Sequence, residues 1–272
     1  MARKQTPAWS FSVQEAAEQL GQLGITPGDR VMVHASLRAI GPVERGGEGL
    51  IEALDQAVGP LGTLVMVLGA RDDWAWVNEK AEHERAALLR DAPPFDAGNT
   101  PAHPDIGVLA ELFRRYPGTC VSDHPEGRIA ARGHNAAEIL ADQPWHDYYG
   151  PGSPLERLVR HNGKILRLGA DLDTATILHY AEYLVPLPAK RRVCRHRMIA
   201  TADGPRIVKI ACLDDENGIV QRDGEDYFAT ILRSFIEGRN TTIGVVGNAS
   251  SELIDAADLV DYAVNWMVDN LS

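Results

Sequence analysis

The chain has 272 residues, of which 44% are hydrophobic, so it can bury a substantial core. No apolar run is long enough to span a bilayer, and residues 1–10 have a basic start without the apolar core of a signal peptide, so we expect a cytoplasmic protein. The net charge of −11 argues against nucleic acid and membranes as partners and favours a polycationic small molecule.

The cysteines give no indication of a metal site. The three of them, Cys120, Cys194 and Cys212, have no metal-ligand spacing. Their odd number is typical of reduced thiols in a cytosol, and a buried structural role is the first expectation for each.

The first quarter of the chain alternates strands and helices. A capping box at 12–15 (SVQE) predicts a helix that runs to about residue 24. A short buried strand is expected at 30–34, an amphipathic helix at 50–58 and a second strand at 63–68. This βαβ-like order predicts a mostly parallel sheet covered by helices.

After the second strand the chain changes character. Residues 74–90 are polar and favour helix, and a proline-rich segment follows at 92–96. We expect residues 70–100 to form a cap or lid outside the core. No repeat, low-complexity tract or linker divides the chain, so we expect residues 1–272 to form a single domain.

The middle of the chain carries two further helix signals. Asp105 is a candidate N-cap for a helix over 106–115, and a short strand or loop should follow at 119–125. After an aromatic loop at 145–152, a capping box with proline at its first helical position (SPLE, 153–156) predicts a helix.

The stretch 165–185 has a strand, a glycine turn and a helix for which Asp173 is the expected N-cap. The expected core stripe of that helix comprises Ile177, Leu178, Ala181, Leu184 and Val185. His179 falls roughly opposite this stripe, with Glu182 three positions on. An α/β enzyme often presents a catalytic base in this way, although from this stretch alone a surface histidine is the simpler interpretation.

The last third of the chain predicts a β-hairpin from 192–200 and 206–213. A helix at 226–237, a strand at 241–246 and a terminal helix at 251–271 should complete the fold.

None of the strong catalytic motifs is present: there is no G-x-S-x-G, Walker loop, H-E-x-x-H or paired C-x-x-C. The weaker signals are His34 at a strand end, the acidic pair Asp72 and Asp73, His124, and His179 with Glu182. Each alone is more often a structural or solvated residue than a functional one.

Taken together and in order, several segments resemble the aminoglycoside 3-N-acetyltransferases over nearly the whole chain. They are VHASLR (33–38), GPLGTLVM (59–66), PDIG (104–107), SDHP (122–125), SP (153–154), TILHYAE (176–182) and GNASSE (247–252). The resemblance implies a three-layer α/β/α fold with a mostly parallel or mixed central sheet and a smaller substrate-side cap. This fold is unrelated to that of the GNAT acetyltransferases.

The same resemblance implies transfer of an acetyl group from acetyl-CoA to the 3-amino group of a 2-deoxystreptamine aminoglycoside, with no metal. It makes His179 the general base, and Glu182 its acidic partner or a substrate ligand. Asp72 or Asp73 would bind the aminoglycoside, and the choice between them stays open. The residues implied to bind coenzyme A are His34, Ser36, Leu37, Arg38, Gly107, Ser122 and His124.

Elementary chemistry agrees with these roles. An amine attacks a thioester only when neutral, and histidine is the side chain suited to accept its proton near pH 7. No enzyme thiol is required if the amine attacks directly. Two alternatives remain: the same chemistry on another natural-product amine, and a protein that binds aminoglycosides without turnover. His103 and the 74–90 insert depart from the family pattern, so the preferred drug stays open, as does the choice between monomer and homodimer.

Overall fold

The computed structural model describes residues 11–222, 224, 226–238 and 241–271. Residues 1–10, on which the argument about a signal peptide was based, lie outside the described residues. Within these ranges, no helix combines the length and the apolar character that crossing a membrane requires.

A seven-stranded mixed sheet forms the centre of the molecule, in the order β3-β4-β2-β1-β5-β9-β8. Its middle strands β2 (Thr63–Val67), β1 (Arg30–Ala35) and β5 (Lys164–Leu168) run parallel to one another. The outer strands continue the sheet by antiparallel pairing. They are β3 (Cys120–Val121), β4 (Ile129–Gly133), β8 (Thr242–Val246) and β9 (Ala249–Asp255).

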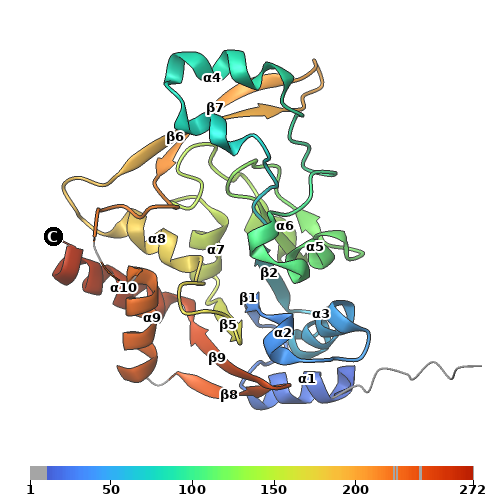
Figure 1. The fold of residues 1–272 in the computed structure, drawn as a ribbon. Helices are drawn as coiled ribbons and strands as arrows, with labels where there is room; N and C mark the ends of the chain where they lie inside the picture. The colour runs from blue at the N-terminus through green and yellow to red at the C-terminus, as the bar shows by residue number, and fades with distance from the viewer. Residues whose placement is uncertain (1–10, 223, 225, 239–240, 272) are drawn as a thin grey trace, which may run out of the picture.

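Helices cover both faces of the sheet, which confirms the predicted three-layer α/β/α fold (Figure 1). One face carries α1 (Val13–Gln22), α2 (Leu37–Ile40), α3 (Gly46–Val58) and α5 (Val108–Arg115). The other carries α6 (Ala136–Leu140), α7 (Pro154–Arg160), α8 (Ile177–Leu184), α9 (Tyr227–Gly238) and α10 (Ala256–Leu271). Alternate residues of β1 face opposite layers: Val31 and Val33 pack into the first core, and Met32 packs into the second.

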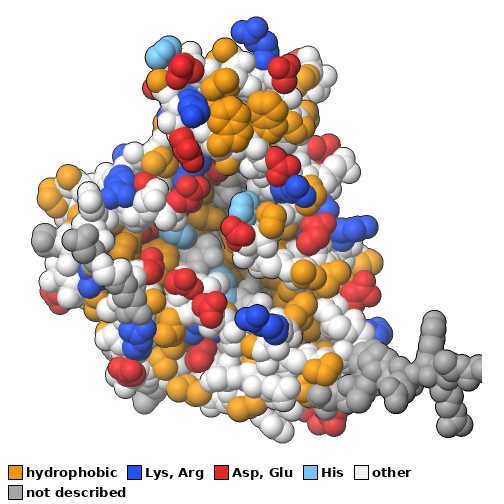
Figure 2. Space-filling view, viewed as in Figure 1, with side chains coloured by type: hydrophobic (Ala, Val, Ile, Leu, Met, Phe, Trp, Pro, Cys, Tyr) orange, Lys and Arg blue, Asp and Glu red, His pale blue; other side chains and the backbone are white. Residues whose placement is uncertain are grey.

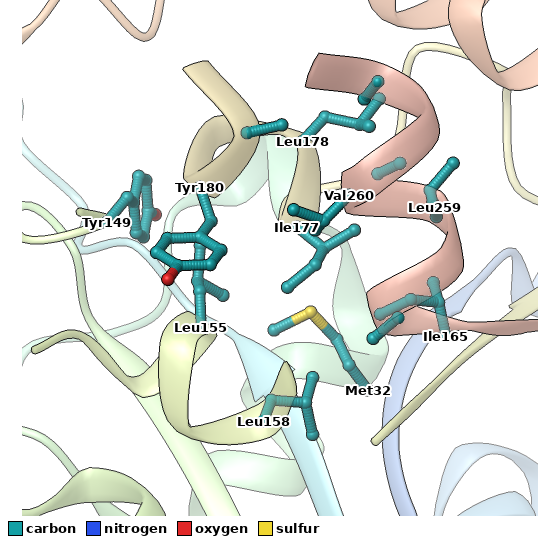
Figure 3. Close-up of a cluster of buried hydrophobic side chains, with 14 of the residues drawn as sticks. Met32, Tyr149, Leu155, Leu158, Ile165, Ile177, Leu178, Tyr180, Leu259 and Val260 are labelled. Carbon is teal, nitrogen blue, oxygen red and sulfur yellow. The ribbon is translucent and has the colours of Figure 1, made fainter. Parts of the chain in front are cut away.

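The second core packs α8 against both the sheet and α10. In Figure 3, Met32 and Ile165 extend from the sheet toward Ile177 of α8 and Val260 of α10. All four side chains are buried. A helix fixed in this way holds its remaining side chains in defined directions, and this is the helix that carries His179.

A smaller layer lies beyond the sheet, at the top of Figure 1. Its hairpin, β6 (Arg192–Ile199) with β7 (Arg206–Leu213), confirms the predicted pair. Three short helices pack against this hairpin, chiefly through Val77 and Leu89. They are η1 (Ala75–Glu79), α4 (Glu82–Leu88) and η2 (Leu89–Asp91). Residues 70–100 and this hairpin are called the cap below.

Local signals placed some helix starts correctly. Ser12 and Glu15 form the predicted capping box, and the Ser153 side chain accepts the Glu156 N–H with Pro154 at the first turn. The Glu156 side chain, however, accepts from Gly152 and not from the cap residue itself.

Three predicted boundaries are wrong. Asp173 is not an N-cap, because α8 begins at Ile177 after a turn. Asp105 lies inside a 3₁₀ turn, η3 (Pro104–Ile106), and Gly107 with φ 95° separates that turn from α5. The predicted terminal helix starts late, because its first residues belong to strand β9, which pairs with β5 and β8.

The predicted core stripe of α8 also needs correction. Leu184 is 42% exposed, whereas Glu182 is only 1% exposed. The helix is buried on two sides, since α9 packs near the face that the sequence pattern had left to solvent.

Candidate active site

A cavity of about 380 Å³ opens at the carboxyl ends of β1 and β2, where Ala35 and Val67 end their strands. We call it the central cleft; residues of η3 and α5 line one side and residues of α8 and α9 the other. Figure 2 shows this face of the molecule hollowed, with acidic side chains gathered around the hollow.

The central cleft is strongly acidic. Six carboxylate side chains line it, and none of the described lining residues is Lys or Arg. The six are Asp105, Asp173, Glu182, Asp215, Glu216 and Asp226. Such a lining attracts a ligand that carries several positive charges.

His179 and Glu182 form a hydrogen-bonded pair in the wall of the cleft. His179 Nδ1 lies 2.8 Å from Glu182 Oε2, one turn apart on α8. Because a carboxylate only accepts hydrogen bonds, Nδ1 carries the hydrogen, and Nε2 of the neutral ring is left as a proton acceptor. The structure thus brings together the two residues for which sequence predicted a catalytic role.

The buried carboxylate of Glu182 uses both its oxygens. The hydroxyl of Tyr227 donates to Oε1, and the Tyr227 oxygen itself accepts the backbone N–H of Ile219 at 3.2 Å. A carboxylate that is 1% exposed needs such donors to remain charged, so Tyr227 supports the ionised form of the pair.

Two aromatic rings fix the orientation of His179. Tyr149 stacks on the imidazole with ring centroids 5.3 Å apart and planes 10° apart, and Phe228 meets it edge-on at 4.8 Å. The side chain keeps 17% of its surface exposed. The ring is therefore held in place and still accessible from the cleft.

The acidic surroundings raise the pKa of His179. Burial alone would lower this pKa, but the hydrogen bond and charge of Glu182 outweigh it, with help from the charges of Asp215 and Asp226. The result lies above the ordinary value of 6.5. The imidazolium form is stabilised, as required of a group that must take up a proton.

A groove of about 800 Å³, called the cofactor groove below, adjoins the central cleft. The two share lining residues such as Ala35 and Ile106. Of the residues predicted to bind coenzyme A, the structure brings Ser36, Leu37, Arg38 and Gly107 to this groove. Arg38 is exposed, while the Ser36 side chain caps α2 by accepting the Ala39 N–H.

His34, another predicted cofactor residue, lines the central cleft and not the groove. It is 4% exposed, and its Nε2 is buried without a hydrogen-bond partner. Burial, with the nearby charge of Arg167, lowers the pKa of His34 to about 4.

Ser122 and His124 are not brought to either space. His124 Nδ1 accepts the backbone N–H of Gly127 at 2.9 Å, and its Nε2 donates to the Trp145 carbonyl oxygen at 3.0 Å. Ser122 accepts the Ile129 N–H at 3.1 Å. Both side chains are committed to the backbone, so their predicted contact with coenzyme A stays a prediction without support from the geometry.

Asp72 and Asp73 occupy different environments, and neither lines the central cleft. The Asp72 carboxylate is 14% exposed, and it pairs with Arg197 of β6 at 2.8 Å. Asp73 is 68% exposed, and among the described residues its ion pair is with Arg71, two positions earlier. Asp72 instead lines another space of about 560 Å³, whose walls come mostly from the cap itself.

A buried network of charges joins the cap to the central cleft. Arg195 of β6 pairs with Asp215 at 2.7 Å, and Tyr148 donates to the same carboxylate at 2.6 Å. Glu126 lies between Arg195 and Arg197, and burial raises its pKa to about 7 despite their charges. Local sequence patterns did not predict this network, although the acidic run at 214–216 was a visible signal.

The described ranges contain no group of three or more His, Cys, Asp or Glu side chains placed to hold a metal ion. What they do contain is a histidine oriented by a buried carboxylate, in an acidic cleft at the ends of parallel strands. Such an arrangement is typical of α/β enzyme sites that transfer protons.

Comparison with known proteins identifies the family. The family model for aminoglycoside 3-N-acetyltransferase matches residues 32–268. Aminoglycoside N(3)-acetyltransferase III of Serratia marcescens is 38% identical over 262 residues, covering 94% of this chain and 97% of the relative. The corresponding enzyme VII of Streptomyces paromomycinus is 37% identical, covering 94% and 91%.

Solved structures of aminoglycoside acetyltransferases have a similar fold. AAC-IIIb in a binary complex with CoASH has a TM-score of 0.89 and 36% identity, covering 95% of this chain and 97% of that one. AAC-VIa bound to sisomicin has a TM-score of 0.87 and 37% identity, covering 96% and 98%. The chain belongs to the aminoglycoside 3-N-acetyltransferase family, as the sequence motifs predicted, and it is an enzyme of that class.

Proposed function

We propose that the chain acetylates the 3-amino group of 2-deoxystreptamine aminoglycosides by direct transfer from acetyl-CoA, with His179 as the general base. The observation that carries this proposal is the pair of His179 and Glu182 in the wall of a cleft lined by carboxylates. The pair supplies a proton acceptor, and the carboxylates supply attraction for a polycation.

The substrate assignment has two supports. An aminoglycoside carries several ammonium groups, and the described lining of the central cleft is acidic without a Lys or Arg side chain. A family member, AAC-VIa, has been solved with the aminoglycoside sisomicin bound. Resistance to such antibiotics would follow from acetylation, because it removes one of the positive charges.

The cofactor groove suits coenzyme A. AAC-IIIb has been solved with CoASH bound. In this chain the cationic Arg38, in the first turn of α2, lines the groove. Arginine binds phosphate oxygens through charge-assisted hydrogen bonds. Because the groove adjoins the central cleft, a thioester at its inner end can meet an amine bound in the cleft.

The proposed reaction transfers the acetyl group directly from the sulfur of acetyl-CoA to the amine nitrogen. The amine nitrogen attacks the thioester carbonyl carbon and forms a C–N bond, while His179 Nε2 removes one N–H proton. Glu182 stabilises the imidazolium that results. The tetrahedral intermediate then breaks its C–S bond, and the leaving thiolate takes the proton from His179. The products are the amide and coenzyme A with its free thiol.

An acyl-enzyme on cysteine has no support in the geometry. Neither the central cleft nor the cofactor groove is lined by any of the chain's three cysteines. Burial raises the pKa of Cys212 to about 12, so its thiol stays protonated. Direct attack of the amine on the thioester needs no such nucleophile.

Two further predictions belong to the same proposal. Residues 70–100 would serve as a cap on the substrate side of a single domain, consistent with their packing on the β6–β7 hairpin beside the charged network. A cytoplasmic location fits an enzyme that consumes acetyl-CoA and carries three free cysteines.

The test is release of the coenzyme A thiol from acetyl-CoA across a panel of aminoglycosides and unrelated amines, with the acetylated nitrogen located by NMR. We expect thiol release with 2-deoxystreptamine aminoglycosides and the acetyl group on the 3-amino nitrogen. Turnover of only an unrelated amine would replace the substrate assignment. Tight aminoglycoside binding without thiol release would make the protein a binder and contradict the proposal.

A further inference from the structure

His34 lies in the central cleft next to Ala35, a residue that also lines the cofactor groove. It occupies the carboxyl end of β1, and alternation along the strand puts its side chain on the same side of the sheet as Met32, which packs into the core beneath α8. His34 lines the central cleft together with His179 of α8. The two imidazoles therefore reach one space from different elements.

Nε2 of His34 lacks the hydrogen bond that a buried histidine nitrogen normally has. The side chain is 4% exposed, and its Nε2 is buried with no partner among the described residues. His124, which is equally buried, has both ring nitrogens bonded to the backbone. An unpaired buried polar group destabilises the fold, so its presence at a cleft points to a ligand that completes it.

The charge state of His34 suits a donor and not a base. Burial lowers the pKa of His34 to about 4, with a contribution from the charge of Arg167. Arg167 lies opposite His34 in the pairing of β1 with β5. Arg167 is fixed in place by Glu252 at 2.9 Å and by the Ala170 carbonyl oxygen at 2.7 Å. At neutral pH the ring is thus uncharged and carries one N–H.

We propose that His34 is an oxyanion donor, its ring N–H binding the carbonyl oxygen of the acetyl thioester. This inference rests on the proposed function. As the amine forms its C–N bond, the C=O electron pair moves onto oxygen, and the His34 hydrogen bond stabilises that charge. When the C–S bond breaks, the pair returns to the carbonyl, so His34 neither gains nor loses a proton.

This role is distinct from that of His179. His179 has a hydrogen-bonded carboxylate and a raised pKa, which fit proton removal. His34 has a neutral ring, and no carboxylate of the described part of the chain bonds its Nε2. The positive charge of Arg167, the register partner of His34 on β5, also favours negative charge on the thioester oxygen. The two histidines divide the work between proton transfer and charge stabilisation.

The experiment measures the infrared carbonyl band of ¹³C-labelled acetyl-CoA bound to the enzyme without an amine. The variants are His34→Leu, which removes the donor, and His34→Gln, which keeps an amide N–H near the position of Nε2. His179→Ala is the matched control, since it removes the base and leaves the donor. Calorimetry of acetyl-CoA binding and kcat for an aminoglycoside accompany each spectrum.

We expect the wild-type enzyme and His179→Ala to shift the carbonyl band to lower frequency than in His34→Leu. His34→Leu should lose about 10²–10³-fold in kcat while acetyl-CoA affinity changes only a few-fold. His34→Gln should fall between wild type and Leu in both band position and kcat, and it provides the test if the Leu variant does not fold.

Bound acetyl-CoA with the same carbonyl band in wild type and His34→Leu would overturn the inference while leaving the proposed function intact. The same conclusion follows if both His34 variants keep near-wild-type kcat. A wild-type enzyme that neither binds nor consumes acetyl-CoA would instead overturn the proposed function, and this inference with it.

Discussion

Tyr227 donates its hydroxyl hydrogen to Glu182, the carboxylate that orients His179. The two residues come from different helices, α9 and α8, and both line the central cleft. Glu182 is thus held by a donor on each oxygen, and the basicity of the pair depends on both.

Tyr227→Phe should raise the pKa seen on the acid side of the kcat/KM profile, by about half a unit to one unit. A carboxylate with one donor fewer is more basic, so it holds the proton of the His179 imidazolium more strongly. Measurement of kcat/KM against pH tests this. Tyr180→Phe is the matched control, because Tyr180 lies on α8 with His179 and Glu182 but its hydroxyl donates to Glu156. Equal profiles for wild type and Tyr227→Phe would exclude Tyr227 from the positioning of the pair.

Arg38→Ala should weaken coenzyme A binding about tenfold and leave aminoglycoside binding unchanged, as loss of a charge-assisted phosphate contact would. The motivation is its exposed position in the cofactor groove. Titration calorimetry with each ligand measures both effects. Arg115→Ala, an exposed arginine outside the groove and the cleft, is the control. Unchanged coenzyme A affinity in Arg38→Ala would make Arg38 an ordinary surface residue.

Asp72→Asn should lower the free energy of unfolding by about 1–3 kcal/mol, because it removes one partner of a buried ion pair. Arg197 keeps a second carboxylate, Glu126, at 3.3 Å, which limits the loss. Asp73→Asn, at an exposed position, should stay within about 0.5 kcal/mol of wild type. Urea unfolding of both variants checks the difference. A raised KM in Asp72→Asn without loss of stability would favour direct substrate contact over this structural role.

The depressed pKa values of His34 and His124, both about 4, predict loss of stability in acid. Below the ordinary value of 6.5 the unfolded chain binds protons that the folded histidines do not, so stability present above pH 6.5 is lost as the pH falls toward 4. The raised pKa of Glu126, about 7, acts in the opposite direction over part of this range.

His124→Gln isolates one of these contributions. Its unfolding free energy should depend less steeply on pH between 4.5 and 6.5, by up to about 1.4 kcal/mol per pH unit, the limit for one proton. Denaturant titrations at several pH values give the two slopes, whatever the change in stability at pH 7. Parallel slopes would mean that His124 titrates normally in the folded protein.

Local sequence signals predicted most of the architecture because they act over a few residues. The capping serines Ser12 and Ser153 are examples, since each bonds a backbone N–H three positions away. Strand β9 was missed because its identity is set by pairing. Residues such as Leu253 lie opposite Leu166 of β5, and without those partners the segment resembles the start of α10.

The candidate site was predicted only in part, for a related reason. His179 and Glu182 lie three positions apart, so helical periodicity alone put them together. Tyr227 reaches Glu182 from 45 positions away, and the charge state of His34 depends on Arg167 in a neighbouring strand. Such contacts follow from sheet register and helix packing, which local patterns do not encode.

The central claim is that His179 removes the proton from the attacking amine, and comparison of His179→Ala with wild type tests it most directly. The ring packs between Tyr149 and Phe228 and is not a surface histidine, so this variant should lose some stability. The decisive measurement is kcat for thiol release, with calorimetry of both ligands on the folded variant. The account predicts about a 10²–10⁴-fold lower kcat with both ligands still bound. Near-wild-type turnover by folded His179→Ala would contradict it.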